Sequence, residues 1–230
     1  MSCLTTQFGS MIAFMKWKRT AAALLTAAMM TACASAGAPA QPAASAAAAV
    51  TEETKPVQIT NQVEFEVLQD PADMTGYKWM TAKDTSFKEI SLKESIRFFT
   101  EGGTGILVYS APTCPFCNRA MPVLDDVLAE YGIKACYVDT SQPIAPDQEQ
   151  SMKLYLELTG YISSIFEKDE DGNPMFQIPE VIAVKDGKIV GHHLSLVDSF
   201  TILDEDTQMD DAQTEELKQI YRDLIEACAD

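Results

Sequence analysis

A Cys-x-x-Cys motif set between an apolar run and a helical pattern constrains the fold of this chain more than any other feature. Residues 106–109, Ile-Leu-Val-Tyr, form a continuous apolar run that is typical of a strand buried on both faces. The motif Cys114-Pro115-Phe116-Cys117 follows, and apolar residues then recur on one side of a helix as far as Tyr131. Pro115 suits the first turn of that helix, where a backbone N–H is not needed. The sequence therefore predicts both cysteines at the N-terminal end of a helix that leaves a buried strand.

The spacing and position of the two cysteines indicate redox chemistry. Two intervening residues let both sulfurs come within disulfide distance in a single helical turn. Free N–H groups at a helix N-terminus favour an anion, and the thiolate is the form of cysteine that attacks a disulfide. Lowering a thiol pKa from about 8.5 to about 7 raises the thiolate fraction at pH 7 about fifteenfold. We therefore expect Cys114 to be the nucleophile and Cys117, one turn further in, to resolve the mixed disulfide.

A zinc half-site and a purely structural disulfide are the alternatives for this motif. Zinc needs two further ligands, and the chain offers only the adjacent His192 and His193 and no second Cys-x-x-Cys motif. The acidic stretch 169–173 resembles a calcium loop, but it lacks the required glycine and the final glutamate. A structural disulfide would not need the strand–cysteine–helix order. We therefore expect thiol–disulfide chemistry at Cys114 and Cys117, with no metal and no cofactor.

Short apolar strands alternate with amphipathic helices along the rest of the folded part. Asp186-Gly187 between the last two strands is a strong hairpin signal. This order predicts an α/β fold with a mixed, mostly parallel central sheet that helices flank on both faces, and with an antiparallel edge from the final hairpin. The expected strands cover residues 63–67, 87–90, 106–109, 133–138, 181–184 and 188–190, and the expected helices cover residues 91–100, 114–131, 147–159 and 207–228.

Three features of the sequence resemble the thioredoxin superfamily. The first is the strand, the Cys-Pro-Phe-Cys motif and a helix that contains Pro122. The second is Ile178-Pro179 before the strand at 181–184, and the third is the Asp-Gly turn between the last two strands. The resemblance covers residues 86–230 and implies a thioredoxin-like fold. Residues 111–117, Ala-Pro-Thr-Cys-Pro-Phe-Cys, look most like the bacteriocin-transport-accessory type of extracytoplasmic thioredoxin-like protein.

The resemblance also assigns roles to residues around the two cysteines. It implies that the bond between Ile178 and Pro179 is cis and faces the active-site disulfide. It further implies a substrate groove that these two residues form together with Pro115 and Phe116. Ile178 would offer backbone groups to an extended client strand.

Several positions depart from the thioredoxin pattern or stay open. Thr113 stands where thioredoxins have Trp, and Val108 stands where they have a buried Asp that is thought to move the proton of the resolving thiol. Efficient thioredoxin-type reduction therefore does not follow from the resemblance. Residues 141–177 exceed the minimal fold, and we expect a packed extra helix there rather than a lid or partner surface. Cys136 and Cys228 are either buried free thiols or, in an exported protein, a disulfide.

The first 55 residues have the composition of an export signal followed by a tether. Three basic residues at 16–19 precede an uncharged apolar stretch at 21–32 that is too short to span a bilayer. Small residues before Cys33 resemble the bacterial lipoprotein signal, which would put a lipid on that cysteine; the alternative is secretion with cleavage after Ala36. The sequence thus predicts a lipoprotein-type signal peptide at 1–32, a disordered tether at 33–55, an N-terminal extension at 56–85 and a thioredoxin-like domain at 86–230.

Charge and export together define the expected partners. A formal charge of −17 at pH 7 argues against non-specific binding to nucleic acid, which needs clustered Lys and Arg. We expect a protein of the bacterial cell envelope, extracytoplasmic and lipid-anchored through Cys33. Its partners would be protein clients with thiols or disulfides and a membrane or extracytoplasmic electron donor or acceptor. The expected function is protein thiol–disulfide oxidoreductase, and the alternative is a folding-accessory or binding module that uses the groove without turnover.

Overall fold

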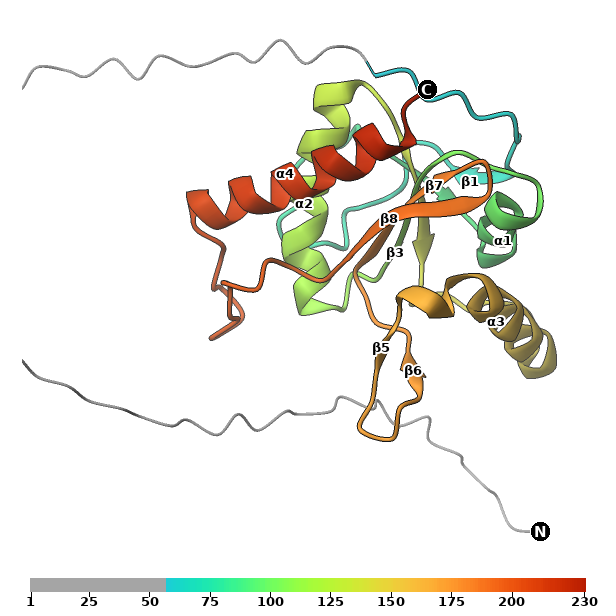
Figure 1. The fold of residues 1–230 in the computed structure, drawn as a ribbon. Helices are drawn as coiled ribbons and strands as arrows, with labels where there is room; N and C mark the ends of the chain where they lie inside the picture. The colour runs from blue at the N-terminus through green and yellow to red at the C-terminus, as the bar shows by residue number, and fades with distance from the viewer. Residues whose placement is uncertain (1–56) are drawn as a thin grey trace, which may run out of the picture. The chain divides into compact units, whose positions relative to one another are not determined.

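Residues 57–230, which the computed structural model describes, form a six-stranded mixed sheet with helices on both faces (Figure 1). The strands lie in the order β1-β2-β4-β3-β7-β8. Strands β2, β4 and β3 are parallel to one another, whereas β1, β7 and β8 pair antiparallel. This is the α/β, thioredoxin-like architecture that the sequence predicted, with β7 and β8 as the antiparallel hairpin. The strands cover Val67–Gln69 (β1), Phe87–Ile90 (β2), Gly105–Ser110 (β3), Ala135–Asp139 (β4), Glu180–Lys185 (β7) and Lys188–Leu194 (β8).

Two helices cover each face of the sheet. Helices α2 (Pro115–Tyr131) and α4 (Asp211–Cys228) pack together on one face, as Figure 1 shows. Helices α1 (Leu92–Thr100) and α3 (Gln148–Ile162) pack on the other face. The core therefore has two apolar layers with the sheet between them.

Strand β3 is shared by both layers. Its side chains alternate, so that Ile106 and Val108 face α2 and α4, whereas Leu107 and Tyr109 face α1 and α3. None of the four is more than 2 % exposed, and the continuous apolar run is thus buried on both faces, as predicted. Burial on both faces fixes the register of β3, and with it the point at which the chain leaves the sheet.

The segment before β2 packs against the sheet, but its strand β1 overlaps the strand expected at 63–67 only at Val67. Phe65 is buried and stacks on Phe98 with ring centroids 4.2 Å apart, whereas Val67 is 39 % exposed. Strand β1 begins only at Val67, because the preceding backbone is bound by α1 instead. The N–H of Glu66 donates to the Glu94 carboxylate at 2.9 Å, which replaces a strand-to-strand hydrogen bond.

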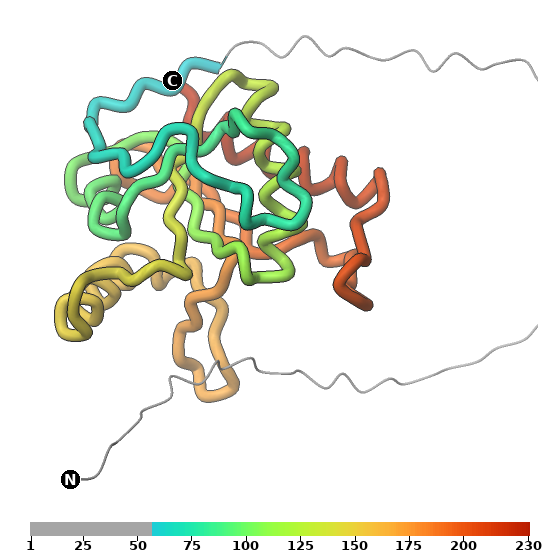
Figure 2. Tube along the Cα trace, turned by 180° about the vertical axis from the view of Figure 1, so that it is seen from behind, coloured from blue at the N-terminus to red at the C-terminus, as the bar shows by residue number. Residues whose placement is uncertain are grey.

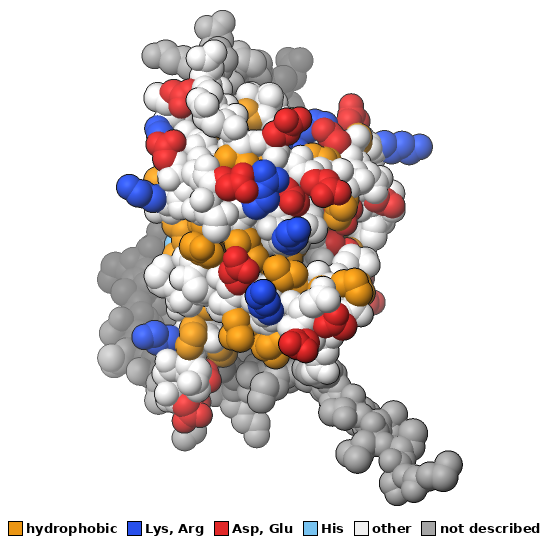
Figure 3. Space-filling view, turned by 90° about the vertical axis from the view of Figure 1, so that its right-hand side faces the viewer, with side chains coloured by type: hydrophobic (Ala, Val, Ile, Leu, Met, Phe, Trp, Pro, Cys, Tyr) orange, Lys and Arg blue, Asp and Glu red, His pale blue; other side chains and the backbone are white. Residues whose placement is uncertain are grey.

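Residues 141–177, the stretch beyond the minimal fold, contain α3 and a small separate hairpin. Helix α3 packs through Leu158 and Ile162 but leaves Met152 and Leu156 exposed at 50 % and 60 %. It is therefore the extra helix that the sequence predicted, but only one of its sides is packed. Figure 3 shows apolar side chains scattered between charged ones on the face of the molecule that carries this helix. A 3-10 turn (Ser163–Ile165) leads into strands β5 (Glu167–Lys168) and β6 (Pro174–Met175), which extend away from the sheet in Figures 1 and 2.

Cys136 and Cys228 are free thiols in different layers of the core. Cys136 on β4 belongs to the layer of α1 and α3, and Cys228 at the end of α4 belongs to the layer of α2. The alternative in which they form a disulfide is therefore not realised. Burial raises the pKa of each thiol to about 11, so both are poor nucleophiles at neutral pH.

Some expectations concern a part of the chain that the structure does not describe. The signal peptide at 1–32, the tether at 33–55 and the lipidation site Cys33 lie outside the described residues. Within residues 57–230, no helix has both the length and the apolar character needed to cross a membrane.

The turn between β7 and β8 is the hairpin that Asp186-Gly187 predicted. The two residues have φ angles of 50° and 76°, as a type I′ turn requires. The turn also lies close to the loop that follows α1. The N–H of Gly187 donates to the carbonyl of Gly103 at 2.9 Å, and a Cβ at position 187 would lie 3.1 Å from the carbonyl oxygen of Phe99.

We expect Gly187→Ala to lower the free energy of unfolding by more than the ~1–2 kcal/mol that left-handed backbone costs a non-glycine residue, because the new methyl also meets backbone. Gly172→Ala is the matched control: Gly172 has a φ of 84° in the β5–β6 turn, with nothing within 4 Å of its Cβ position. Urea unfolding of both variants measures the difference. Equal losses would show that the close approach at Gly187 does not contribute.

Candidate active site

Cys114 caps the N-terminus of α2 where the chain leaves β3. Its N–H donates to the carbonyl of Ala111 at 3.1 Å, which closes a turn directly after the strand. Its backbone is extended, with φ −84° and ψ 122°, and its sulfur accepts the N–H of Cys117 at 3.3 Å. Pro115 takes the first helical position, where its fixed φ suits the helix. A cysteine thus occupies the place that Ser or Asp takes at many helix starts, and its sulfur lies at the positive end of the helix dipole.

The two thiols differ in exposure and in pKa. Cys114 is partly exposed, whereas Cys117 is fully buried. A hydrogen bond from the Cys117 thiol, helped by the N–H groups of Cys117 and Phe116, lowers the pKa of Cys114 to about 7 against the opposing effect of burial. Burial raises the pKa of Cys117 far above its ordinary value, and the hydrogen bond to Cys114 adds to the rise. The pair therefore offers one thiolate near neutral pH, and it is the accessible one.

Ile178 and Pro179 lie next to Cys114 in space. The bond between them is cis, which confirms what the resemblance implied. Pro179 is buried directly before β7, and the Cys114 thiol donates to the carbonyl of Ile178 across 3.6 Å. Pro115 and Phe116, which follow Cys114, are exposed, Phe116 by 43 %. Of the four residues expected to form a substrate groove, Pro115 and Phe116 follow Cys114 in the chain, and the carbonyl of Ile178, next to Pro179, lies at its sulfur.

Asn118 fixes the turn that carries Cys114, a role that the sequence analysis missed. Its side-chain amide donates to the carbonyl of Pro112 at 2.7 Å and to the carbonyl of Cys114 at 2.9 Å. Its side-chain oxygen accepts the backbone N–H of Lys78. Asn118 therefore connects the Cys114 turn to the segment before β2. All three partners are backbone groups, which leave no signal in the sequence.

Arg119 ties the same helical turn to the loop between β8 and α4. The residue is only 2 % exposed, and its guanidinium donates to the carbonyls of Pro115 at 2.7 Å and Thr207 at 2.6 Å. It also lies 4.6 Å from the centroid of the Trp79 ring, a cation–π distance. Carbonyl oxygens thereby satisfy a buried charge. Sequence reasoning missed this residue too, because its partners are distant along the chain.

Glu180 is a buried carboxyl directly after Pro179. Burial raises its pKa to about 8, and its Oε1 lies 3.0 Å from Nδ1 of His192, whose pKa burial lowers. At neutral pH the contact is therefore a hydrogen bond between neutral groups rather than an ion pair. Glu180 lies opposite Tyr109 in the β3–β7 ladder and so faces α1 and α3, whereas Cys117 belongs to the other layer. Glu180 is therefore on the wrong face to take a proton from Cys117.

The residues considered as metal ligands do not come together. His192 and His193 are neighbours on β8 and so face opposite sides of the sheet. Asp169 holds the β5–β6 turn by accepting the N–H groups of Asp171 at 3.0 Å and Asn173 at 2.8 Å. In the part of the chain that the structure describes, no three His, Cys, Asp or Glu side chains lie close enough to hold a metal ion.

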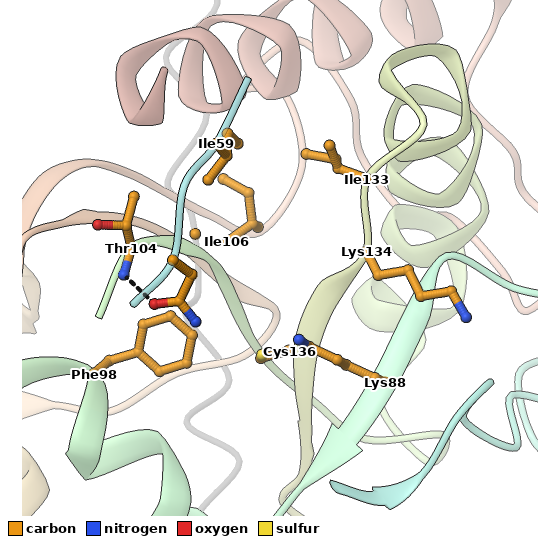
Figure 4. Close-up of a pocket in the computed structure, with 10 residues that line it drawn as sticks. Ile59, Lys88, Phe98, Thr104, Ile106, Ile133, Lys134 and Cys136 are labelled. Atoms are coloured by element: carbon orange, nitrogen blue, oxygen red, sulfur yellow. Dashed lines mark hydrogen bonds between the residues drawn. The ribbon is translucent and has the colours of Figure 1, made fainter. Parts of the chain in front are cut away.

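A cavity of about 230 Å³ lies near the beginning of β3, at the end of the strand opposite to Cys114 (Figure 4). Gly105, Ile106, Lys88 and Cys136 are among the residues that line it. The Lys88 side chain points toward the Cys136 sulfur and hydrogen bonds to it. The cavity is thus separate from the site around Cys114.

Comparisons with known proteins add no argument about the site. No protein-family model matches the chain, and no curated protein matches it. Among solved structures, the chain is similar to a thioredoxin from Aeropyrum pernix, with 19 % sequence identity and a TM-score of 0.29. That match covers 46 % of this chain and 73 % of the thioredoxin. The chemistry of the site therefore rests on its own geometry.

We expect iodoacetamide to label Cys114 before any other cysteine of residues 57–230, at a rate that reaches half its plateau near the thiol pKa of about 7. Only the thiolate reacts, and the hydrogen bonds from Cys117 and the helix N–H groups favour that form. Cys117→Ala removes the largest of these effects, so its midpoint should lie at higher pH. Peptide mass mapping after brief labelling of the reduced chain measures both. Labelling of Cys117 ahead of Cys114 would contradict the assignment.

Proposed function

We propose that this protein is an extracytoplasmic thiol–disulfide oxidoreductase that uses Cys114 and Cys117 on protein clients. The observation that carries the proposal is a partly exposed thiol with a pKa of about 7 beside a fully buried one. Disulfide exchange requires an accessible thiolate and a second thiol that can displace the client. The sequence of residues 111–117 supports a place among extracytoplasmic proteins of the bacteriocin-transport-accessory type.

The proposed reaction has two exchange steps. In the reducing direction, the Cys114 thiolate attacks one sulfur of a client disulfide and expels the other client sulfur as a thiolate. Cys117 then attacks the Cys114 sulfur, which forms the 114–117 disulfide and releases the client reduced by two electrons. In the oxidising direction the same steps run in reverse. The reduction potential of the pair, together with an electron donor or acceptor in the membrane or outside the cytoplasm, sets the direction.

Client binding would use the surface around the Cys114 sulfur. The carbonyl of Ile178 lies 3.6 Å from that sulfur, so an extended client segment placed there could also pair with the backbone before β7. Phe116 is 43 % exposed and would supply apolar contact. Backbone pairing makes few demands on the client sequence, which suits an enzyme with several protein clients.

We also propose that lipid on Cys33 anchors the protein in the bacterial cell envelope. The basic residues at 16–19, the short apolar stretch at 21–32 and the small residues before Cys33 support this order of parts. The segment 33–55 is rich in Ala, Pro, Ser and Thr, a composition typical of a tether. It would hold the acidic domain away from anionic lipids.

Cys117→Ser should trap mixed disulfides between Cys114 and its clients, because the nucleophile remains while the resolving thiol is lost. Non-reducing electrophoresis of alkylated cell-envelope extracts detects the adducts, and Cys114→Ser is the matched control that should form none. Insulin reduction with a thiol donor tests turnover, which both substitutions should abolish. If Cys117→Ser forms no adducts and the unsubstituted protein shows no turnover, the binding-module alternative replaces the enzyme.

Mass spectrometry of the mature N-terminus tests the anchor. We expect Cys33 as the first residue, carrying lipid, and we expect Cys33→Ser to move the protein out of the membrane fraction, because stable anchoring needs acyl chains. An unmodified N-terminus at Gly37 would contradict lipidation and favour secretion. It would leave the redox proposal unaffected, since Cys33 takes no part in that chemistry.

A further inference from the structure

A row of three buried hydroxyl groups ends at the buried sulfur of Cys117. The hydroxyl of Tyr77 donates to Oγ of Ser110 at 2.8 Å, and it lies 3.0 Å from the hydroxyl of Tyr137. Neither tyrosine is more than 2 % exposed, and Ser110 is not exposed at all. Ser110 is the last residue of β3, and its side chain hydrogen bonds to the Cys117 thiol. The three side chains come from β3, β4 and the segment before β2.

The proton count gives this row a direction. Each hydroxyl has one hydrogen to donate and lone pairs to accept. Tyr77 gives its hydrogen to Ser110, so the contact between the two tyrosines needs Tyr137 as the donor. The hydrogen of Ser110 is then left for the Cys117 sulfur, which the backbone N–H of Ala111 also approaches. Every hydrogen bond of the row therefore points toward Cys117.

A Cys117 thiolate needs such donors, because Cys117 is fully buried and its sulfur is not open to solvent. The titratable groups that act on Cys117 are Cys114 at the start of α2, Tyr77 before β2, Tyr137 on β4 and Tyr221 on α4. None of them carries a positive charge. Val108 in the same layer is apolar, and the buried Glu180 faces the other layer. Charge-assisted hydrogen bonds are then the remaining means of stabilising a buried anion.

We propose that Ser110, oriented by Tyr77 and Tyr137, stabilises the thiolate of Cys117 while it attacks the mixed disulfide on Cys114. The proposal rests on the thiol–disulfide exchange proposed above and adds a catalytic residue, Ser110, and two positioning residues. In this step the bond between Cys117 and Cys114 forms, and the bond between Cys114 and the client sulfur breaks. The client sulfur leaves with the bonding electron pair and takes up the proton that Cys117 lost.

The proposal changes the role of the segment before β2. Residues 57–85 precede the expected thioredoxin-like domain, yet Tyr77 from this segment supplies the middle hydroxyl of the row. Asn118 also binds the backbone of the neighbouring Lys78, which holds this part of the segment against the first turn of α2. The segment therefore completes the site instead of only covering the sheet.

Reaction with Ellman's reagent separates the two steps of exchange. In the full chain with Cys3→Ser and Cys33→Ser, attack by Cys114 releases one aromatic thiolate and attack by Cys117 releases the second. We expect Tyr77→Phe to slow the second release by about three- to tenfold, since it weakens hydrogen bonding to a charged group. The first release should stay within about twofold, because the hydroxyl that this substitution removes hydrogen bonds to Ser110 and Tyr137 and not to Cys114. The pH midpoint of the second release should also rise.

Tyr109→Phe is the matched control. Tyr109 is as deeply buried as Tyr77 and donates to a serine in the same way, to Ser95 at 3.0 Å, but in the other layer of the core. We expect both releases to keep their rates and pH midpoints in this variant. Equal effects of Tyr77→Phe and Tyr109→Phe on the second release would overturn the proposal.

Ser110→Ala, with Ser95→Ala as its control, gives a second comparison should Tyr77→Phe fail to fold. The expected result is again a slower second release and a higher pH midpoint for Ser110→Ala alone; no difference between the two alanine variants would overturn the proposal. Loss of the second release in the unsubstituted chain is a different outcome. It would refute disulfide exchange itself, and the role of the hydroxyl row with it.

Discussion

The N–H groups at the start of α2 need an acceptor, and the sulfur of Cys114 supplies it. The positions of the other residues around Cys114 depend on this interaction. A hydroxyl or carboxylate would satisfy the same groups but would not exchange with a disulfide. The cap keeps its place because β3, buried on both faces, ends at Ser110, and because Pro115 starts the helix directly after Cys114, whose N–H closes the intervening turn. Asn118 then binds the turn from within the helix, so strand, turn and helix fix one sulfur position together.

The same cap makes two identical thiols unequal. Cys114 receives hydrogen bonds and keeps contact with solvent, so its ionised form is favoured. Cys117 lies one turn further along α2, where burial favours the neutral form. A buried thiol that must ionise during exchange needs local donors, and the layer around Cys117 offers hydroxyl groups in place of a carboxylate or a cation. The apolar Val108 and the orientation of Glu180 toward the other layer explain why no carboxyl serves there.

Local patterns in the sequence predicted the parts of the site that lie close together along the chain. The apolar run of β3, the capping position of Cys114 and the Asp186-Gly187 turn were foreseen in this way, whereas the cis bond before Pro179 was implied by the resemblance to the thioredoxin superfamily. Contacts between distant segments were not foreseen. No role at the site was predicted for Tyr77, because its hydrogen bond to Ser110 spans 33 residues. Arg119 binds the carbonyl of a residue 88 positions away. Because every residue has a carbonyl, the sequence does not identify this partner. The strand begins at Val67 rather than at residue 63, because the backbone N–H of Glu66 donates to the Glu94 side chain of α1. The pattern of apolar residues along a strand does not predict such a contact.

The reduction potential of the 114–117 pair tests the central claim most directly. Equilibration of the full chain, with Cys3 and Cys33 replaced by Ser, in glutathione buffers gives this potential when the free thiols are alkylated and counted by mass. Both cysteines should be oxidised together in one two-electron transition. Its potential should lie nearer about −270 mV than about −120 mV, because a Cys114 pKa of about 7 stabilises the reduced form only modestly. Glutathione bound to Cys114 at every buffer ratio, with Cys117 still a free thiol, would contradict the account.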